Sequence, residues 1–272
     1  MAKTVLITGA SSGIGKATAK HFRAKGWNVV ATMRKVEDGS EFEGDEGYLV
    51  TRLDLVDAAS ITAAVEAALA KFGSIDVLVN NAGYGAYGPL EATPMEKLRR
   101  QMEVNYFGLV ATMQAVLPTM RAAKSGAIVN VSSIGGRMAY PLGSLYHGSK
   151  WAVEGLTEAV SFELLALGIR AKLVEPGGVK TDFAGRSFDF SNDASLAEYQ
   201  PMVGALLGAM ENMDTSSHQQ PEEVAEVIFE AATDASPRLR YVSGQGAKDM
   251  LATRYPGDEE AFLAGLRKQF GM

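Results

Sequence analysis

Three residues in the middle of the chain have the types and spacing of an acid–base catalytic group. Tyr146 and Lys150 lie four residues apart in Tyr-His-Gly-Ser-Lys, and Ser133 precedes Tyr146 by thirteen residues. Four residues are about one helical turn, so a phenol and an ammonium would share one helix face. A nearby ammonium favours the phenolate, and we therefore expect the pKa of Tyr146 to lie below its ordinary value of about 10. A tyrosine tuned in this way can exchange a proton in a transition state.

The alternative is that this Tyr-x-x-x-Lys pair arises by chance on a helix surface, where such pairs are common. If the set is catalytic, Tyr146 would protonate a carbonyl oxygen as hydride arrives. Ser133 would then donate a hydrogen bond to the same oxygen, where negative charge develops. Lys150 would tune the tyrosine and reach a nicotinamide ribose. Ser132 is adjacent to Ser133, and only the spacing to Tyr146 separates the two serines.

A glycine-rich stretch near the N terminus, from Thr8 to Gly15, has the features of a phosphate-binding loop. Its three glycines follow an apolar run and precede a helical pattern. Such a loop lets the backbone approach a pyrophosphate, and the helix N terminus supplies N–H donors. An ordinary turn is the alternative, because the spacing is G-x-x-x-G-x-G rather than the common G-x-G-x-x-G. The strand–loop–helix context favours a dinucleotide site, with the candidates Gly9, Ser11, Ser12, Gly13, Ile14 and Gly15.

The end of the predicted second strand, Thr32-Met33-Arg34-Lys35, indicates which dinucleotide is bound. In Rossmann-like sheets an acidic residue at that point holds the ribose 2′-hydroxyl of NAD, whereas an arginine suits the 2′-phosphate of NADP. Here two cations and no carboxylate follow the strand. We therefore predict NADP(H), with Arg34 as the bidentate partner of the phosphate and Lys35 beside it. A solvated basic turn is the alternative.

The composition is typical of a single α/β domain. A chain of 272 residues, of which 47% are hydrophobic, can bury a sizeable core, and no linker or repeat divides residues 1–272. The net charge of −6 argues against nucleic acid and acidic membrane surfaces as partners. We expect a cytoplasmic protein, because a strand follows the N terminus directly and no apolar run reaches the ~18 residues that cross a membrane.

Two classes of site are excluded or disfavoured. The chain has no cysteine, which excludes disulfides, thiolate metal sites and a cysteine nucleophile. Its three histidines, His21, His147 and His218, lie far apart without metal-ligand spacing, so we predict no metal site. His147 points about 100° away from Tyr146 on the same helix, and we interpret it as structural.

Apolar runs alternate with helical patterns and define the elements that must position these groups. The pattern predicts an α/β fold with a doubly wound parallel sheet of about seven strands, Rossmann-like, with helices on both faces. Ligands bind beyond the carboxyl ends of the strands in such sheets. The predicted strands are 4–8, 28–33, 47–53, 75–79, 127–131, 169–174 and 239–242. The predicted helices are 13–25, 58–72 with an N-cap at Asp57, 95–120, 145–167 and a last one after 221.

Together these residues resemble the short-chain dehydrogenase/reductase family over nearly the whole chain. The stretch from Thr8 to Gly15 is similar to the TGxxxGxG loop of that family, and Asn80 to Gly83 is similar to its NNAG element. Asp54, after the third strand, matches an aspartate that contacts adenine. The resemblance implies a cofactor site that also includes Leu55, Asn81, Ala82, Gly83, Tyr146, Lys150, Pro176, Gly177, Val179 and Thr181.

The resemblance also implies roles beyond cofactor binding. It completes a catalytic tetrad of Asn105, Ser133, Tyr146 and Lys150. In this tetrad Asn105 supports a water-mediated proton relay to Lys150. Helices at about 106–120 and 145–167 commonly form a dimer interface in the family, so we expect a homodimer or homotetramer. Apolar surface on the second helix would come from Trp151, Val153, Leu156, Val160 and Leu164. Burial of these residues against the sheet of the same chain is the alternative.

Residues 182–220 form a long segment that we predict to be a substrate loop. Its aromatic and methionine side chains suit an apolar pocket wall or lid, although they would equally suit packing of the loop onto the body. Tyr84, Tyr87 and Met138 could complete such a pocket. The chain length and ending resemble the hydroxysteroid-dehydrogenase-like branch, which implies a bulky apolar ketone or secondary alcohol. The side chains of the segment are Phe183, Phe188, Phe190, Tyr199, Met202, Met210 and Met213.

The sequence therefore predicts an NADP-dependent carbonyl reductase or alcohol dehydrogenase that acts on a small molecule. One alternative is a regulatory protein that senses NADP without turnover, which would need the glycine loop but not a tuned tyrosine. Another is reduction of a carbon–carbon double bond, which the spacing of Ser133 and Tyr146 disfavours through the family resemblance.

Overall fold

A parallel sheet forms the centre of the protein. The computed structural model describes residues 2–212, 214–216 and 218–254. All neighbouring strands of this sheet are parallel, and their order is β3-β2-β1-β4-β6-β7-β9. The prediction of a seven-stranded, doubly wound sheet is confirmed. The strands are β1 (Thr4–Thr8), β2 (Asn28–Met33), β3 (Tyr48–Arg52), β4 (Val77–Asn80), β6 (Gly126–Val131), β7 (Ile169–Pro176) and β9 (Arg240–Ser243).

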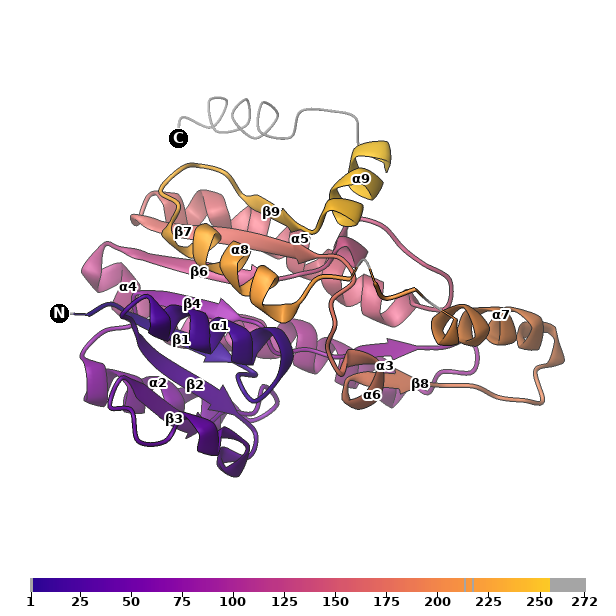
Figure 1. Cartoon of the computed structure of the whole chain (residues 1–272), viewed down its shortest axis with the longest axis horizontal. Helices are drawn as coiled ribbons and strands as arrows, with labels where there is room; N and C mark the ends of the chain where they lie inside the picture. Colours follow the sequence, from indigo (N-terminus) through magenta and orange to yellow (C-terminus); the bar gives the residue numbers. More distant parts are fainter. Residues whose placement is uncertain (1, 213, 217, 255–272) are drawn as a thin grey trace.

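Most side chains of the strands are apolar because both faces of the sheet are covered, although β7 also buries Lys172 and Glu175. Successive side chains point to opposite faces, so Val5 and Ile7 join one core cluster while Leu6 joins the other. Helices α1 (Gly13–Ala24) and α8 (Pro221–Thr233) cover the first face. Helices α2 (Ala58–Phe72), α4 (Gly108–Ala123) and α5 (Ser144–Leu165) cover the second (Figure 1).

Two local signals on α2 were interpreted correctly. Asp57 is its N-cap, and the Oδ1 atom of this residue accepts a hydrogen bond from the Ser60 amide at 3.2 Å. Gly73 ends the helix with a φ of 80°, a left-handed conformation that favours glycine.

The predicted helical region 95–120 is interrupted, because a π-helical turn, η2 (Glu103–Phe107), separates α3 (Met95–Met102) from α4.

The order of the strands places a crevice at the carboxyl end of the sheet. The chain winds outward from β1 in one direction and from β4 in the other, so the loops after these two neighbouring strands diverge. Short helical turns follow two other strands, namely η1 (Val36–Phe42) after β2 and η3 (Ile134–Gly136) after β6. The crevice is therefore bordered by the glycine loop, the Asn-rich loop after β4 and the serines after β6.

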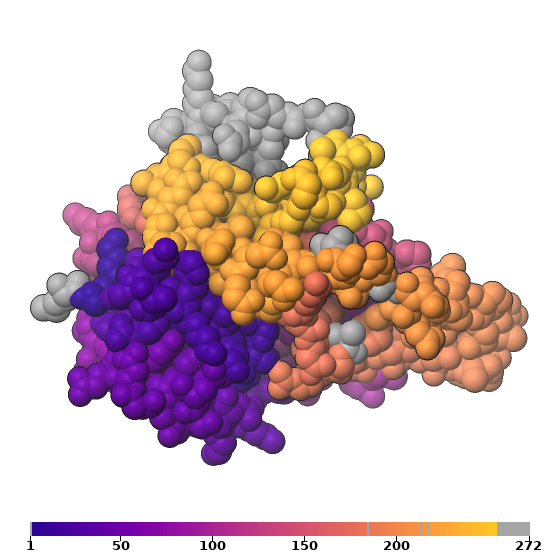
Figure 2. Space-filling model, in the orientation of Figure 1, coloured from indigo at the N-terminus to yellow at the C-terminus, as the bar shows by residue number. Residues whose placement is uncertain are grey.

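The segment 182–220 is more ordered than a loop, and this corrects the sequence-based expectation. It contains α6 (Phe183–Arg186), β8 (Phe188–Phe190), η4 (Ala197–Tyr199) and α7 (Gln200–Glu211). Strand β8 pairs in parallel with β5 (Gly85–Tyr87) in a second, two-stranded sheet. Figure 1 shows this segment extending from the body beside the carboxyl ends of the strands, and Figure 2 shows the same protrusion in a space-filling view. Met213 lies outside the described residues.

Two further expectations are wrong in part. Helix α8 is not the last one, because α9 (Gln245–Arg254) follows β9 and packs Ala247 and Leu251 against Ile134. Val153 and Leu164 of α5 do not form outer surface, since they are 0% and 4% exposed and pack on the sheet of their own chain. Leu156 and Val160 are half-buried against the same cluster, whereas Trp151 is 45% exposed. Within the described ranges, no helix combines the length and apolarity needed to cross a membrane.

Candidate active site

The glycine loop between β1 and α1 is shaped by close backbone contacts. Gly9 and Gly13 have φ values of 70° and 51°, which side chains rarely tolerate. A Cβ at Gly15 would clash with the carbonyl oxygen of Gly9 and lie 2.5 Å from the side-chain nitrogen of Asn81. Ser11 and Ser12 are half-buried, and Ile14 packs against the core. A side chain at any of these three glycine positions would therefore strain the loop or clash with it.

The Asn-rich loop after β4 is hydrogen-bonded to the glycine loop. The Nδ2 atom of Asn81 donates to the carbonyl oxygens of Thr8 at 3.0 Å and Gly9 at 3.3 Å. The amides of Asn81 and Ala82 both donate to the Thr8 hydroxyl, at 3.0 and 3.1 Å. Asn80 donates instead to Asn130 on the neighbouring strand β6, at 2.9 Å. These amides therefore tie strand ends together.

A cavity of about 420 Å³ lies where the glycine loop meets the end of β2. Arg34 and Lys35 line it, and two residues of the 182–220 segment, Arg186 and Ser187, join them. The lining contains three cations and one carboxylate, which fits a ligand with more than one phosphate. The lining residues are Ser11, Ser12, Arg34, Lys35, Asp38, Arg186 and Ser187.

The turn after β7 approaches the glycine loop from the opposite side. Pro176 ends β7, and the Gly177 amide donates to the Ser243 carbonyl oxygen at 3.2 Å. Val179 forms a parallel bridge with Gln219. Thr181 reaches the loop itself, because a Cβ at Gly13 would lie 3.2 Å from Thr181 Cγ2. The predicted nicotinamide-flanking segment and the predicted phosphate loop are therefore neighbours.

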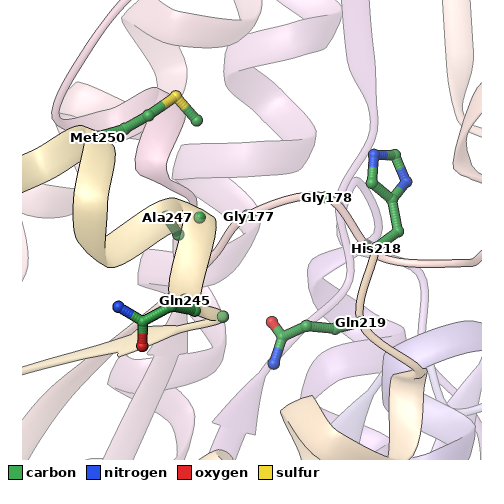
Figure 3. Close-up of a pocket in the computed structure, with 9 residues that line it drawn as sticks. Gly177, Gly178, His218, Gln219, Gln245, Ala247 and Met250 are labelled. Atoms are coloured by element: carbon green, nitrogen blue, oxygen red, sulfur yellow. The ribbon is translucent and has the colours of Figure 1, made fainter. Parts of the chain in front are cut away.

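A smaller pocket of about 180 Å³ lies beside the same turn. Figure 3 shows the turn meeting Ala247 and Met250 of α9 and the stretch of His218 and Gln219 around this pocket. The four catalytic candidates are not among its lining residues, and it is smaller than the ~300 Å³ of a typical small-molecule site. We therefore do not assign the substrate to this pocket.

Asp54 and Leu55 lie at the end of β3, next to the end of β2. The Leu53 amide donates to the Met33 carbonyl oxygen at 2.9 Å, which aligns the two strand ends. Asp54 is half-buried, and its Oδ1 accepts from the Val56 amide at 3.3 Å. Leu55 packs onto the start of α4, where a Cβ at Gly108 would lie 2.5 Å from Leu55 Cβ.

Ser133 and Tyr146 are in contact. Ser133 follows β6, and its Oγ accepts a hydrogen bond from the Gly135 amide at 3.0 Å, which orients the hydroxyl. The pKa of Tyr146 is raised above its ordinary value by burial, and a hydrogen bond from the Ser133 side chain opposes that rise. Ser132 is buried, so the structure separates the two serines as the spacing predicted.

The expected effect of Lys150 on Tyr146 is not what the structure shows. The two side chains share one face of α5, as predicted, but Lys150 Nζ donates to the Val131 carbonyl oxygen at 2.9 Å. Burial dominates the pKa of Tyr146 and raises it, which corrects the prediction of a lowered value. Burial also lowers the pKa of Lys150 to about 8, and the Glu154 carboxylate partly offsets this effect. The tyrosine therefore keeps its proton at neutral pH.

Asn105 joins the loop after β4 to α5. It lies in the π-helical turn η2, and its Oδ1 accepts from the Tyr84 amide at 3.0 Å. Its Nδ2 donates to the Tyr84 carbonyl oxygen at 2.8 Å and to Ser149 Oγ at 3.0 Å. A Cβ at Gly83 would lie 3.1 Å from Asn105 Oδ1 and 3.7 Å from Lys150 Nζ. The residues of the proposed tetrad thus converge at one strand end.

Aromatic rings surround Tyr146. Tyr87 stacks on it at a centroid distance of 5.6 Å, and Phe183 meets it edge-on at 5.9 Å. Phe188 lies 5.1 Å from Tyr87, and burial raises the pKa of Tyr87 as well. His147 lies behind Tyr146 in a structural role, because its ring nitrogens bond to the Gly135 carbonyl oxygen and to the Tyr140 amide. The ring of Tyr146 is therefore packed among aromatic side chains.

Comparison with known proteins identifies the family. Residues 3–192, well over half of the 272-residue chain, match the model of short chain dehydrogenases. The chain belongs to the short-chain dehydrogenase family. It is 39% identical over 245 residues to an uncharacterized oxidoreductase of Schizosaccharomyces pombe, a match that covers 88% of this chain and 100% of that protein.

Two further members extend the comparison. The chain is 36% identical over 247 residues to the NADPH-dependent 3-dehydrocapnine reductase of Ornithobacterium rhinotracheale, over 87% of this chain and 86% of that protein. A crystal structure of a short-chain dehydrogenase from Streptomyces avermitilis has a TM-score of 0.84 and 32% identity, over 99% of this chain and 95% of that one. The protein is therefore an oxidoreductase of the short-chain dehydrogenase family, with that family's fold.

Within this short-chain dehydrogenase, the sequence did not reveal Arg186 and Ser187 as part of the cation-lined cavity of about 420 Å³. Arg186 is a cation five residues after Thr181, and that closeness was the only signal available. The turn of α6 and the pairing of β8 with β5 decide where it points, and neither can be derived from local pattern. Asp38 was missed for a similar reason, since it lies in the short helical turn η1 rather than at the strand end.

Proposed function

We propose that the protein is an NADP(H)-dependent carbonyl reductase or alcohol dehydrogenase that interconverts a ketone and a secondary alcohol. The observation that carries this proposal is the position of Tyr146. Its half-buried phenol contacts Ser133 and faces apolar rings at the same sheet edge as the cation-lined cavity. A protein that only senses a dinucleotide has no need of a half-buried, serine-bonded tyrosine at that edge.

The side chains suggest a division of roles in the reducing direction. NADP(H), when bound, supplies or accepts the hydride. Tyr146, whose raised pKa keeps it protonated, gives its proton to the carbonyl oxygen. Ser133 donates a hydrogen bond to that oxygen as charge develops on it. Lys150, with a pKa lowered to about 8, can carry a proton near neutral pH, and Asn105 holds the neighbouring backbone in place.

The substrate that we propose is bulky and largely apolar, in line with the resemblance to the hydroxysteroid-dehydrogenase-like branch. Support comes from the rings of Tyr87, Phe183 and Phe188 around the phenol. The decisive assay is NADPH oxidation by the purified protein with a panel of ketones and aldehydes, from small aromatic carbonyls to steroids. Turnover that rises with apolar size would support the proposal. Tight NADPH binding without turnover of any compound would favour the regulatory alternative.

Arg34→Ala is expected to raise the Kd for NADPH by about 10- to 100-fold, the loss of one bidentate charged contact. The Kd for NADH should change little, because NADH lacks the 2′-phosphate. Nucleotide fluorescence titration would measure both constants. Arg121→Ala, at the exposed end of α4, is the matched control and should change neither. Equal affinity of the wild-type protein for NADPH and NADH would contradict the assignment of NADP(H).

We also propose that the chain forms a homodimer or homotetramer through α4 and α5. Trp151 on α5 is 45% exposed, and Phe107, at the start of α4, is 52% exposed. Light scattering at micromolar concentration should therefore give two or four times the chain mass of 28.9 kDa. Trp151→Glu should reduce that mass, because a charge would be buried in the interface. A monomeric mass for the wild-type protein would overturn this expectation.

A further inference from the structure

Arg186 connects two parts of the structure that are remote in sequence. It is the last residue of α6, in the segment after β7, yet it lines the same cavity of about 420 Å³ as Arg34 and Lys35. The two predicted phosphate ligands follow β2, so the cavity is closed by parts of the chain that are remote in sequence. A third cation in this position increases the attraction of the cavity for a doubly charged phosphate.

The present partner of Arg186 holds it only weakly. Its Nε atom lies 2.9 Å from Asp182 Oδ2, four residues earlier, and the two side chains are 61% and 59% exposed. Exposed ion pairs of this kind contribute little stability because water screens both charges. A phosphate, which can take both arms of a guanidinium, is a stronger partner than this single carboxylate. Arg186 can therefore exchange the Asp182 carboxylate for a phosphate at a small cost in free energy.

The opposite end of α6 contacts the proposed catalytic tyrosine. Phe183, the first residue of α6, meets the ring of Tyr146 edge-on at 5.9 Å. Strand β8 begins directly after α6 and pairs with β5, which brings Phe188 against Tyr87. A helix of four residues is about 6 Å long. The phosphate cavity and the aromatic wall around the phenol are therefore linked by one short, continuous element.

We propose that Arg186 is a third ligand of the 2′-phosphate of NADP(H), and that this contact fixes α6 and with it the aromatic wall of the substrate site. This inference rests on the proposed function. It predicts that the 2′-phosphate selects the cofactor and also orders the segment that meets the substrate. NADH would bind without that second effect.

The binding test compares Arg186→Ala with the wild-type protein for 2′-phospho-ADP-ribose and for ADP-ribose. We expect about a 10-fold rise in Kd for the first compound and no change for the second. Asp182→Ala is the matched control, since it breaks the same ion pair but keeps the cation, and it should bind 2′-phospho-ADP-ribose at least as tightly as the wild type. Equal losses in Arg186→Ala and Asp182→Ala, or equal losses for both nucleotides, would overturn the proposal.

Arg34→Ala, measured in the same series, distinguishes failure of the Arg186 proposal from failure of the proposed NADP(H) site. If Arg34→Ala discriminates between the two nucleotides and Arg186→Ala does not, the inference about Arg186 fails while the proposed cofactor stands. If neither variant discriminates, the proposed NADP(H) site fails as well. Each result is read from binding constants alone, so no substrate needs to be known.

The structural test measures hydrogen exchange of the amides of residues 183–190 at saturating NADPH or NADH. We expect protection to increase several-fold with NADPH and to change little with NADH. Arg186→Ala should lose the increase with NADPH even when it is saturated. Equal protection by both nucleotides, or protection that persists in Arg186→Ala, would show that the segment does not depend on this contact.

Discussion

Tyr146→Phe is expected to lower kcat for carbonyl reduction by about 10²- to 10⁴-fold, the usual contribution of one positioned acid. Phenylalanine keeps the ring that stacks on Tyr87 and meets Phe183, so the local packing should survive. The variant loses only the hydroxyl that contacts Ser133 and holds the proton. Steady-state NADPH oxidation with the best ketone of the panel would measure the effect.

A second Tyr→Phe variant shows whether the loss is specific. Tyr48→Phe removes a phenol at the amino end of β3, away from the carboxyl ends of the strands, whose hydroxyl donates to the Ala19 carbonyl oxygen at 3.4 Å. This variant should keep its kcat. The Kd of Tyr146→Phe for NADPH should stay within about threefold of the wild type, since the phosphate cavity is untouched. A kcat that survives in Tyr146→Phe would contradict the assignment of the acid.

The sheet was predictable because its signals are local. A buried parallel strand is a short apolar run, and β1, β2 and β6 each show one between helical patterns. Residues that end such strands must meet at one edge, whatever the details of packing. That is why the strand pattern alone brings the glycine loop, Ser133 and the Pro176–Gly177 turn to the carboxyl edge of the sheet.

The segment beside the active site could not be derived in this way. Strand β8 is three residues long and pairs with β5, a partner about one hundred residues earlier in the chain. A long-range pairing of so few residues leaves no periodic pattern to recognise. Helix α6 is equally short, so its direction, and therefore the position of Arg186, depends on tertiary contacts.

The pKa of Tyr146 shows a different limit of sequence reasoning. The four-residue spacing correctly placed Lys150 on the same helix face, but spacing carries no information about burial. In the folded chain the phenol is desolvated, and the ammonium is engaged by the Val131 carbonyl oxygen. Loss of hydration therefore outweighs the expected attraction and reverses the direction of the shift.

Lys150 provides a test in which stability and activity should change in opposite directions. It is 7% exposed, and burial lowers its pKa from 10.5 to about 8. The unfolded chain therefore holds this proton more tightly, which destabilises the native state fully below pH 8 and progressively less as the pH rises towards 10.5. Lys150→Met removes the buried charge and keeps most of the side-chain volume.

At pH 7, Lys150→Met is expected to raise the free energy of unfolding by roughly 1–3 kcal/mol, the cost of the pKa shift less the lost bond to Val131. Its kcat should fall by at least about 100-fold. Urea unfolding measured from pH 7 to 10 should show that the increase in the free energy of unfolding becomes smaller above pH 8. Lys172→Met is the control, because Lys172 Nζ donates to two carbonyl oxygens, at 2.7 and 2.6 Å, and its loss should destabilise the fold. A destabilised Lys150→Met would mean that the fold, rather than the chemistry, requires the lysine.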